Sequence, residues 1–171
     1  PFKVKLPKGY QLNMPGVLEY PLNEFHLNSD FADNRYITSL LSWHVFEQAG
    51  FPVPQIRKIQ LQRNGSFEGA YTLAEKYKDE WVDRNPSYKD GEMYEDRWEI
   101  EYPDNIDSSR FDSLESSLGT LTGVEKHNYM LDNIDIQSAI NYMAAQSVAR
   151  SHDWTIQHNT FSYFSSGGRQ K

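Results

Sequence analysis

Polar residues that could do chemistry gather in one short segment near the end of the sequence. Residues 151–164 read Ser-His-Asp-Trp-Thr-Ile-Gln-His-Asn-Thr-Phe-Ser-Tyr-Phe, so that Asp153 and Asn159 lie six positions apart. Both lie between the end of an expected helix and the start of an expected strand, where side chains can converge on a ligand instead of packing in a core. We therefore expect the chemistry of this chain in that loop.

Metal-dependent hydrolysis is an alternative chemistry for the same loop, because His152, Asp153 and His158 are potential metal ligands. Five residues separate the two histidines, which matches neither one face of a helix nor the short ligand spacings typical of zinc sites. The sequence contains no cysteine and no nucleophile-elbow signature. Thiolate metal sites are therefore excluded, and a Ser-His-Asp hydrolase is not indicated.

A helix and a strand are expected to position the loop. Apolar residues recur at three- and four-residue spacing over 136–148, which predicts a helix, and Asp132, Asn133 and Asp135 are candidates for its N-terminal cap. Residues 160–164 alternate between polar and apolar side chains, which predicts a strand.

The start of the chain carries two cations on one side of an expected strand. Residues 2–6 alternate with period two, so that Lys3 and Lys5 point away from the face that holds the apolar residues. Two neighbouring ammonium groups can meet an anion, but lysines on an edge strand also serve to keep that edge solvated. The sequence leaves both interpretations open.

Four more elements are expected in the first half of the chain. They are a strand at 24–28, an amphipathic helix at 37–49 that ends at Gly50, and strands at 55–61 and 69–76. Asn64-Gly65, between the last two strands, is a hairpin signal. Strands and helices mixed in this order predict an α+β fold.

The segment 79–115 differs in composition from the rest of the chain. It holds 13 of the 24 acidic residues and four basic ones, and few of its apolar residues are periodically spaced. We expect an irregular, solvated excursion that contributes little to the core, or else a lid or a partner-binding segment.

Composition limits the kinds of partner. The 171 residues are 38% hydrophobic and suggest a single globular domain, and both ends of the sequence look like cuts within that domain. A net charge of −7, without a cluster of Lys and Arg, argues against a nucleic-acid partner. No apolar run approaches the roughly 20 residues needed to span a bilayer.

Several motifs follow one another in an unusual order. They are Asn34-Arg35 at a helix start, the run 47–54 that reads Glu-Gln-Ala-Gly-Phe-Pro-Val-Pro, Leu61, Asn64-Gly65, Gly69, Tyr71, Leu73 and Glu75-Lys76, and later Asp153, Asn159, Phe161 and Tyr163. In this order they resemble the CotH family of spore-coat-type atypical protein kinases. The family usually continues to a Trp-Asp-x-Asp-like segment that supplies a metal-binding carboxylate, and this chain stops before it.

The resemblance implies a protein-kinase-like fold, of which this chain would carry the nucleotide lobe and the start of the catalytic lobe. The implied activity is Mg²⁺-dependent transfer of a phosphoryl group from ATP to Ser or Thr of a protein substrate rich in Ser. Asp153 would orient the attacking hydroxyl or accept its proton, and Asn159 would ligate Mg²⁺. The gap of six positions between them exceeds the five of a conventional kinase catalytic loop, so the loop conformation is expected to differ.

The resemblance also implies groups that meet the phosphates. Lys3, Lys5, Arg35 and Lys76 are the candidate cations, and Glu75 could pair with one of them or take part in metal binding. Because Glu75 and Lys76 are neighbours in a strand, they should point to opposite faces, and we expect Glu75 to face the cleft.

A non-catalytic binding or adhesion module is the alternative function, since a family resemblance establishes fold better than activity. CotH-like domains also occur in extracellular and adhesive proteins, and the 24 aromatic residues of this chain could form a binding surface. The resemblance suggests the spore coat or the extracellular space as the location.

Overall fold

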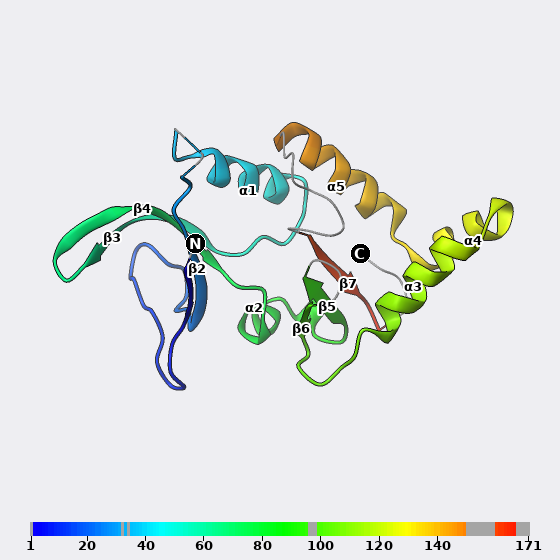
Figure 1. The fold of residues 1–171 in the computed structure, drawn as a ribbon, viewed down its shortest axis with the longest axis horizontal. Helices are drawn as coiled ribbons and strands as arrows, with labels where there is room; N and C mark the ends of the chain where they lie inside the picture. Colours follow the sequence, from blue (N-terminus) through cyan, green and yellow to red (C-terminus); the bar gives the residue numbers. More distant parts are fainter. Residues whose placement is uncertain (1, 32, 34, 96–98, 150–159, 167–171) are drawn as a thin grey trace. The chain divides into compact units, whose positions relative to one another are not determined.

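The chain folds into two compact units, Pro1–Tyr77 and Lys78–Lys171. The computed structural model describes residues 2–31, 33, 35–95, 99–149 and 160–166. Over these residues the chain is mixed α and β with two antiparallel sheets (Figure 1), which confirms the predicted α+β class.

A four-stranded antiparallel sheet with the order β1-β2-β4-β3 forms the first unit. Its strands are β1 (Phe2–Lys5), β2 (Glu24–Asn28), β3 (Ile56–Arg63) and β4 (Ser66–Glu75). Asn64 and Gly65 join β3 to β4 with φ angles of 53° and 81°, the left-handed geometry of a two-residue hairpin turn. The four predicted strands and the predicted hairpin are therefore confirmed.

One face of this sheet carries the apolar core of the first unit. Leu22 and Leu73 are fully buried, and Phe25 and Leu27 are nearly so. The segment between β1 and β2 adds Leu18 to the same cluster. Because side chains alternate along a strand, the opposite face of the sheet is the one that can hold polar groups.

Helix α1 (Thr38–Gln48) lies where the sequence predicts a helix. The carboxylate of Asp33 accepts hydrogen bonds from the backbone N–H groups of Arg35 at 3.0 Å and Thr38 at 2.8 Å, so it satisfies a donor that the first helical turn leaves open. Desolvation raises the pKa of Asp33, but these hydrogen bonds outweigh it and hold the pKa below its usual value. Gly50, with a φ of 86°, ends the helix.

The second unit contains a three-stranded sheet with the order β6-β5-β7 and several helices. Its elements are α2 (Asp79–Arg84), the short 3₁₀ helix η1 (Pro86–Tyr88), β5 (Glu92–Glu95), β6 (Glu99–Tyr102), α3 (Ser109–Thr120), α4 (Gly123–Asn133), α5 (Ile136–Ala149) and β7 (Phe161–Phe164). The predicted helix and strand of this half are confirmed as α5 and β7. The carboxylate of Asp135 accepts a hydrogen bond from the N–H of Ser138 at 3.0 Å, which makes Asp135 the cap of α5.

The segment 79–115 is not the irregular, core-poor excursion expected from its composition. It forms α2, η1, β5, β6 and the start of α3. Its buried apolar residues are Trp81, Val82, Met93, Tyr94, Phe111 and Leu114. The expectation failed because the two strands are only four residues long and each holds two glutamates and two apolar residues, so each shows too few apolar positions to form a recognisable period.

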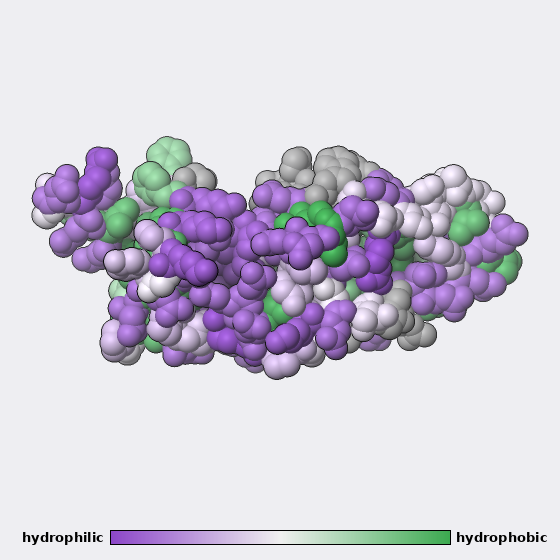
Figure 2. Space-filling view, turned by 90° about the horizontal axis from the view of Figure 1, so that it is seen from below, coloured by the Kyte–Doolittle hydropathy of each residue, from purple (hydrophilic) through white to green (hydrophobic). Residues whose placement is uncertain are grey.

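Helices α3 and α4 were not predicted from the sequence. In the part of the chain that the structure describes, no helix is both long and apolar enough to cross a membrane. Figure 2 shows a face of the molecule on which hydrophilic side chains predominate and hydrophobic ones are scattered.

Candidate functional site

Four lysines of the first unit lie on one face of its sheet, opposite the apolar core. The register places Lys3 beside His26, His26 beside Ala74, and Lys58 beside Thr72, two positions from Ala74. Residues side by side, or two apart in one strand, share a face. We call this surface the lysine face, and its cations are Lys3, Lys5, Lys58 and Lys76.

The lysine face gathers four of the eight basic residues of the first unit, and at least two of them form ion pairs. Lys5 forms an ion pair with Glu24 at 3.3 Å, and Lys58 forms one with Asp30. Lys58 also interacts with the carboxylate of Asp33, whose pKa it helps to lower. Lysines grouped on one face can attract an anion even though the whole chain has a net charge of −7.

The lysines of this face differ in how firmly they are held. The Lys5 side chain is 77% exposed, as is typical of a solvated surface group, whereas the Lys58 side chain is 22% exposed. The ammonium of Lys58 donates to Asp30 Oδ2 and, at 2.6 Å, to the hydroxyl of Thr72. Lys76 is buried at the end of β4, where its backbone N–H donates to the carbonyl of Glu24 at 3.4 Å.

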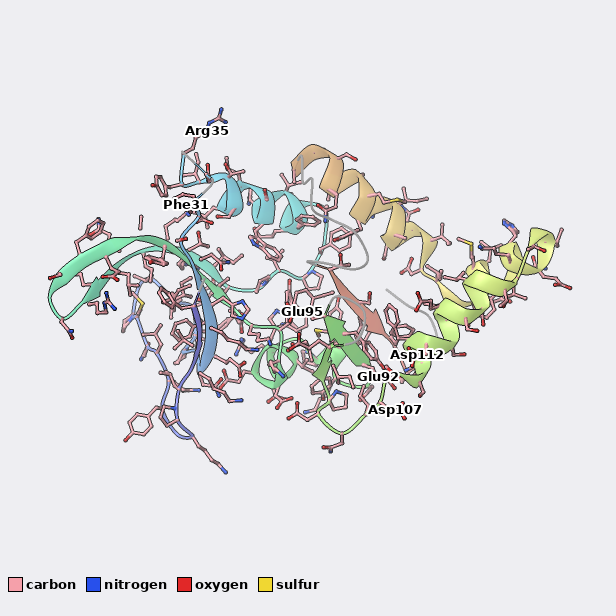
Figure 3. The ribbon with its side chains drawn as sticks, viewed as in Figure 1. Phe31, Arg35, Glu92, Glu95, Asp107 and Asp112 are labelled. Atoms are coloured by element: carbon pink, nitrogen blue, oxygen red, sulfur yellow. The ribbon has the colours of Figure 1, made fainter. Side chains whose placement is uncertain are left out.

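Arg35 does not join the lysine face. It lies in the loop before α1 and its side chain points away from that helix (Figure 3), in an exposed position. Its backbone N–H donates to Asp33, as described above. The structure therefore brings together three of the four predicted cations, Lys3, Lys5 and Lys76.

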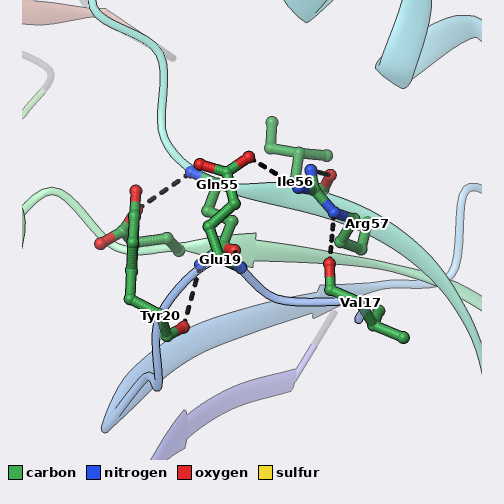
Figure 4. Close-up of polar contacts among 7 residues, drawn as sticks. Val17, Glu19, Tyr20, Gln55, Ile56 and Arg57 are labelled. Carbon is green, nitrogen blue, oxygen red and sulfur yellow. Dashed lines mark hydrogen bonds and ion pairs between the residues drawn. The ribbon is translucent and has the colours of Figure 1, made fainter. Parts of the chain in front are cut away.

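Glu75 lies on the other face of the sheet, in a buried set of hydrogen bonds. Its Oε2 accepts from the backbone N–H of Gln55 at 3.0 Å and from the hydroxyl of Tyr20 at 3.3 Å. The side-chain amide of Gln55 donates to the carbonyl of Tyr20 at 3.2 Å and accepts from the N–H of Glu19 (Figure 4). Glu75 and Lys76 therefore point to opposite faces, as predicted, and Lys76 is the one that shares a face with the other cations; that Glu75 faces the nucleotide cleft stays a prediction.

The predicted catalytic Asp153 and the predicted metal ligand Asn159 lie outside the described residues, as do His152 and His158. Their roles stay predictions. The elements that precede and follow them, α5 and β7, are the helix and strand that the sequence predicts.

A second charged cluster lies in the second unit. Carboxylate oxygens of Glu95, Glu99 and Glu101 lie within 4.8 Å of one another, and Glu101 is completely buried. Figure 3 shows Glu95 on β5. Carboxylates are ligands of hard divalent cations, but the ammonium of Lys78 lies 3.3 Å from Glu101 and already supplies a positive charge there.

Sequence reasoning missed Lys58 and Asp30. A signal was present, because Lys58 interrupts the apolar residues Ile56 and Ile59 of an expected strand, and a lysine inside such a run needs a partner. The partner could not be found, since Asp30 reaches Lys58 only through the pairing of β2 with β4 and of β4 with β3.

Comparisons with known proteins agree with the motif order. No curated protein matches the chain. The family model described as "CotH kinase protein" matches residues 1–171, which is the whole sequence given. The chain therefore belongs to the CotH family.

Proposed function

We propose that this chain is part of a kinase-like domain that transfers the γ-phosphoryl group of ATP, with Mg²⁺, to Ser or Thr of a protein substrate. The proposal is supported by membership of a family described as kinases. The observation that carries it is the lysine face, four lysines grouped on one side of a sheet in a chain of net charge −7. The first unit would be the nucleotide lobe, and the second the start of the catalytic lobe.

The chemistry asks mainly for positioning and for charge stabilisation, because the protein itself needs to form no covalent bond. Lys3, Lys5 and Lys76 would hold phosphate oxygens on the lysine face. Asp153 would orient the attacking hydroxyl and accept its proton, and Asn159 would hold Mg²⁺ through its amide oxygen. Bound Mg²⁺ offsets the negative charge of the phosphates.

Two predicted nucleotide-binding residues take different roles in this proposal. Arg35, exposed before α1, is free to contact the protein substrate or the outer end of the nucleotide. Glu75 ties the segment before β2 to the start of β3 through Tyr20 and Gln55, and so keeps the sheet in register beneath the lysines.

A binding module is the second candidate, and one observation favours it. Phe31 is 91% exposed and lies in the same loop as Arg35 (Figure 3). A large aromatic side chain exposed beside a cation is typical of a protein contact. Both functions could use this loop, but only the kinase requires Asp153.

The test is transfer of labelled phosphate from Mg-ATP to a Ser-rich protein and to the protein itself, with the full-length parent and its Asp153→Ala variant. Label that appears with the parent and is lost by at least about a hundredfold in the variant supports the kinase. Asp132→Ala is the matched control, because it removes an exposed carboxylate from α4, and it should transfer label like the parent.

Absence of label from a folded parent, with Mn²⁺ as well as Mg²⁺, would contradict the proposed transfer and favour the binding module. Equal transfer by the parent and by Asp153→Ala would leave a kinase but would remove Asp153 from its catalytic role.

A further inference from the structure

The turn that joins β3 to β4, Asn64-Gly65, carries a side-chain amide that can react with its own backbone. Asn64 alone among the asparagines of the sequence precedes a glycine. The backbone nitrogen of the following residue can attack the side-chain carbonyl carbon of an asparagine, and a glycine there leaves this approach open because it has no Cβ. The proposed kinase chemistry does not use this turn, so the inference does not depend on it.

Both reacting groups are accessible. Asn64 and Gly65 are exposed at the end of the hairpin, and a Cβ built on Gly65 would meet nothing within 4 Å. Within the described part of the chain, neither the side-chain amide of Asn64 nor the N–H of Gly65 makes a hydrogen bond. The attacking nitrogen is therefore neither covered nor held by a partner.

The closed turn keeps these two groups out of the reactive geometry. The backbone of Asn64 is left-handed, with a φ of 53°. The five-membered ring that the attack forms fixes a different rotation about the Cα–C bond of the asparagine. The turn must therefore open for a moment before the nitrogen of Gly65 can reach the side-chain carbon of Asn64.

The outer part of the hairpin can open locally. Strand β2 pairs with β4 only over residues 72–75, so that in the described structure residues 66–71 pair with β3 alone. This two-stranded ribbon extends past β2 (Figure 1), and its register shifts between Leu61 and Gln62. A two-stranded ribbon is only marginally stable by itself, and such segments open at a small part of the free energy of global unfolding.

A second pair of this kind, Asp90-Gly91, lies in a closed environment. Its glycine N–H donates to the carbonyl of Tyr88 at 3.4 Å. A Cβ at Gly91 would clash with the carbonyl oxygen of Phe164 and the ring of Tyr163. The nitrogen of Gly91 is therefore confined by its neighbours, whereas that of Gly65 is not.

We propose that Asn64 is a site of spontaneous deamidation, with water as the second reactant. The nitrogen of Gly65 bonds to Cγ of Asn64, the bond from Cγ to the side-chain nitrogen breaks, and that nitrogen leaves as ammonia with the proton from Gly65. Water then adds to one of the two carbonyl groups of the resulting succinimide ring. Opening of the ring gives aspartate or isoaspartate, and no atom is oxidised or reduced.

The two products differ in their effect on the hairpin. Aspartate keeps the length of the main chain, and Asp-Gly suits the same turn. It adds one negative charge next to the ion pair of Arg63 with Glu68, whose charged groups are 2.8 Å apart. Isoaspartate puts an extra methylene into the main chain, so it disturbs the pairing of Arg63 with Ser66. Deamidation therefore makes the end of the hairpin more acidic and loosens part of the molecules there.

The test is incubation of the full-length protein in mildly alkaline buffer, followed by proteolysis and mass spectrometry of the peptides. Asn64 should deamidate at least about tenfold faster than Asn128, which is exposed on α4 but precedes a tyrosine. Both aspartate and isoaspartate should form. Asn64→Gly is the matched control, because Gly-Gly suits the same turn, and it should lack the acidic form that the parent accumulates on ion exchange.

Three results would overturn the proposal. The first is deamidation of Asn64 in the folded protein at no more than the rate of Asn128. The second is rapid deamidation of Asn64 in urea but not in buffer, which would show that the closed turn protects the amide in the native protein. The third is formation of aspartate without isoaspartate, which would indicate direct hydrolysis of the amide without attack by Gly65.

Discussion

At the scale of single residues, the first unit buries polar groups by giving each a specific partner. The Glu75 carboxylate accepts hydrogen bonds from the N–H of Gln55 and the hydroxyl of Tyr20. The Lys58 ammonium donates hydrogen bonds to Asp30 and Thr72. A buried polar group is tolerated only when its hydrogen bonds are made. These residues are therefore costly to change one at a time.

Glu75→Ala should lower the free energy of unfolding by about 1–3 kcal/mol, because it leaves the Gln55 N–H and the Tyr20 hydroxyl without this acceptor. Glu75→Gln, which keeps an acceptor oxygen, should cost less. Chemical denaturation of the three proteins measures both effects. Glu68→Ala at the hairpin removes a carboxylate from a pair with the 74% exposed side chain of Arg63 and should change stability by less than about 1 kcal/mol. A loss as large for Glu68→Ala as for Glu75→Ala would contradict this account.

Gly91 offers a second test at this scale. A Cβ atom at this position would fall inside van der Waals contact with the carbonyl oxygen of Phe164 and the ring of Tyr163. Gly91→Ala should therefore lower the free energy of unfolding by about 1–3 kcal/mol, measured by denaturant titration. Gly119→Ala in α3, where a Cβ would meet nothing within 4 Å, should be neutral or slightly stabilising. Equal stability of the two variants would show that β7 does not pack against Gly91 as described.

At the scale of elements, the sequence predicts the helices and strands that are long enough to show a repeated spacing of apolar residues. Strands β1 to β4, helix α1, helix α5 and strand β7 all lie where alternation or helical spacing indicates them. Helix α3 was missed although Phe111, Leu114 and Leu118 recur at helical spacing, because the surrounding acidic residues suggested a solvated segment. Strands β5 and β6 were missed since four residues are too few for a period.

The candidate site is predictable only in part, for a reason of geometry. Alternation alone shows that Lys3 and Lys5 share a face. That Lys58 and Lys76 lie on the same face follows only from the strand order β1-β2-β4-β3, in which β2 and β4 are neighbours in space but not in sequence.

The stability that Asp33 gives to the start of α1 should depend on pH. The hydrogen bonds to Asp33 lower its pKa in the folded state, so its stabilising contribution is present above the unfolded pKa of about 4 and is lost as the pH falls through the lower folded pKa. At about pH 6 the parent should therefore have a higher melting temperature than Asp33→Asn. The difference between the two melting temperatures should narrow steadily as the pH is lowered toward about 2. Thermal unfolding followed by circular dichroism measures it.

If the difference in melting temperature between the parent and Asp33→Asn is constant over this pH range, the charge of Asp33 does not stabilise the start of α1. Asp132→Asn, which neutralises an exposed carboxylate of α4, controls for the general effect of net charge and should not reproduce the dependence.

At the scale of the whole molecule, charge is divided unequally between the two units. Residues 1–77 hold 8 basic and 7 acidic residues, for a net charge of +1, and residues 78–171 hold 9 basic and 17 acidic residues, for a net charge of −8. An anionic ligand is therefore favoured by the first unit alone. The lysine face concentrates that preference on one side of one sheet, which fits the phosphate groups of a nucleotide.

The most direct test of this account is the affinity of the full-length protein for Mg-ATP, compared between the parent and the double variant Lys3→Met/Lys5→Met. Both lysines are exposed, so the variant should fold. We expect ATP to bind at least about tenfold more weakly while adenosine binds as before. The control Lys8→Met/Lys89→Met, which removes two exposed cations outside the lysine face, should match the parent. Equal ATP affinity of the parent and the Lys3→Met/Lys5→Met variant would contradict the assignment of the lysine face to phosphate binding.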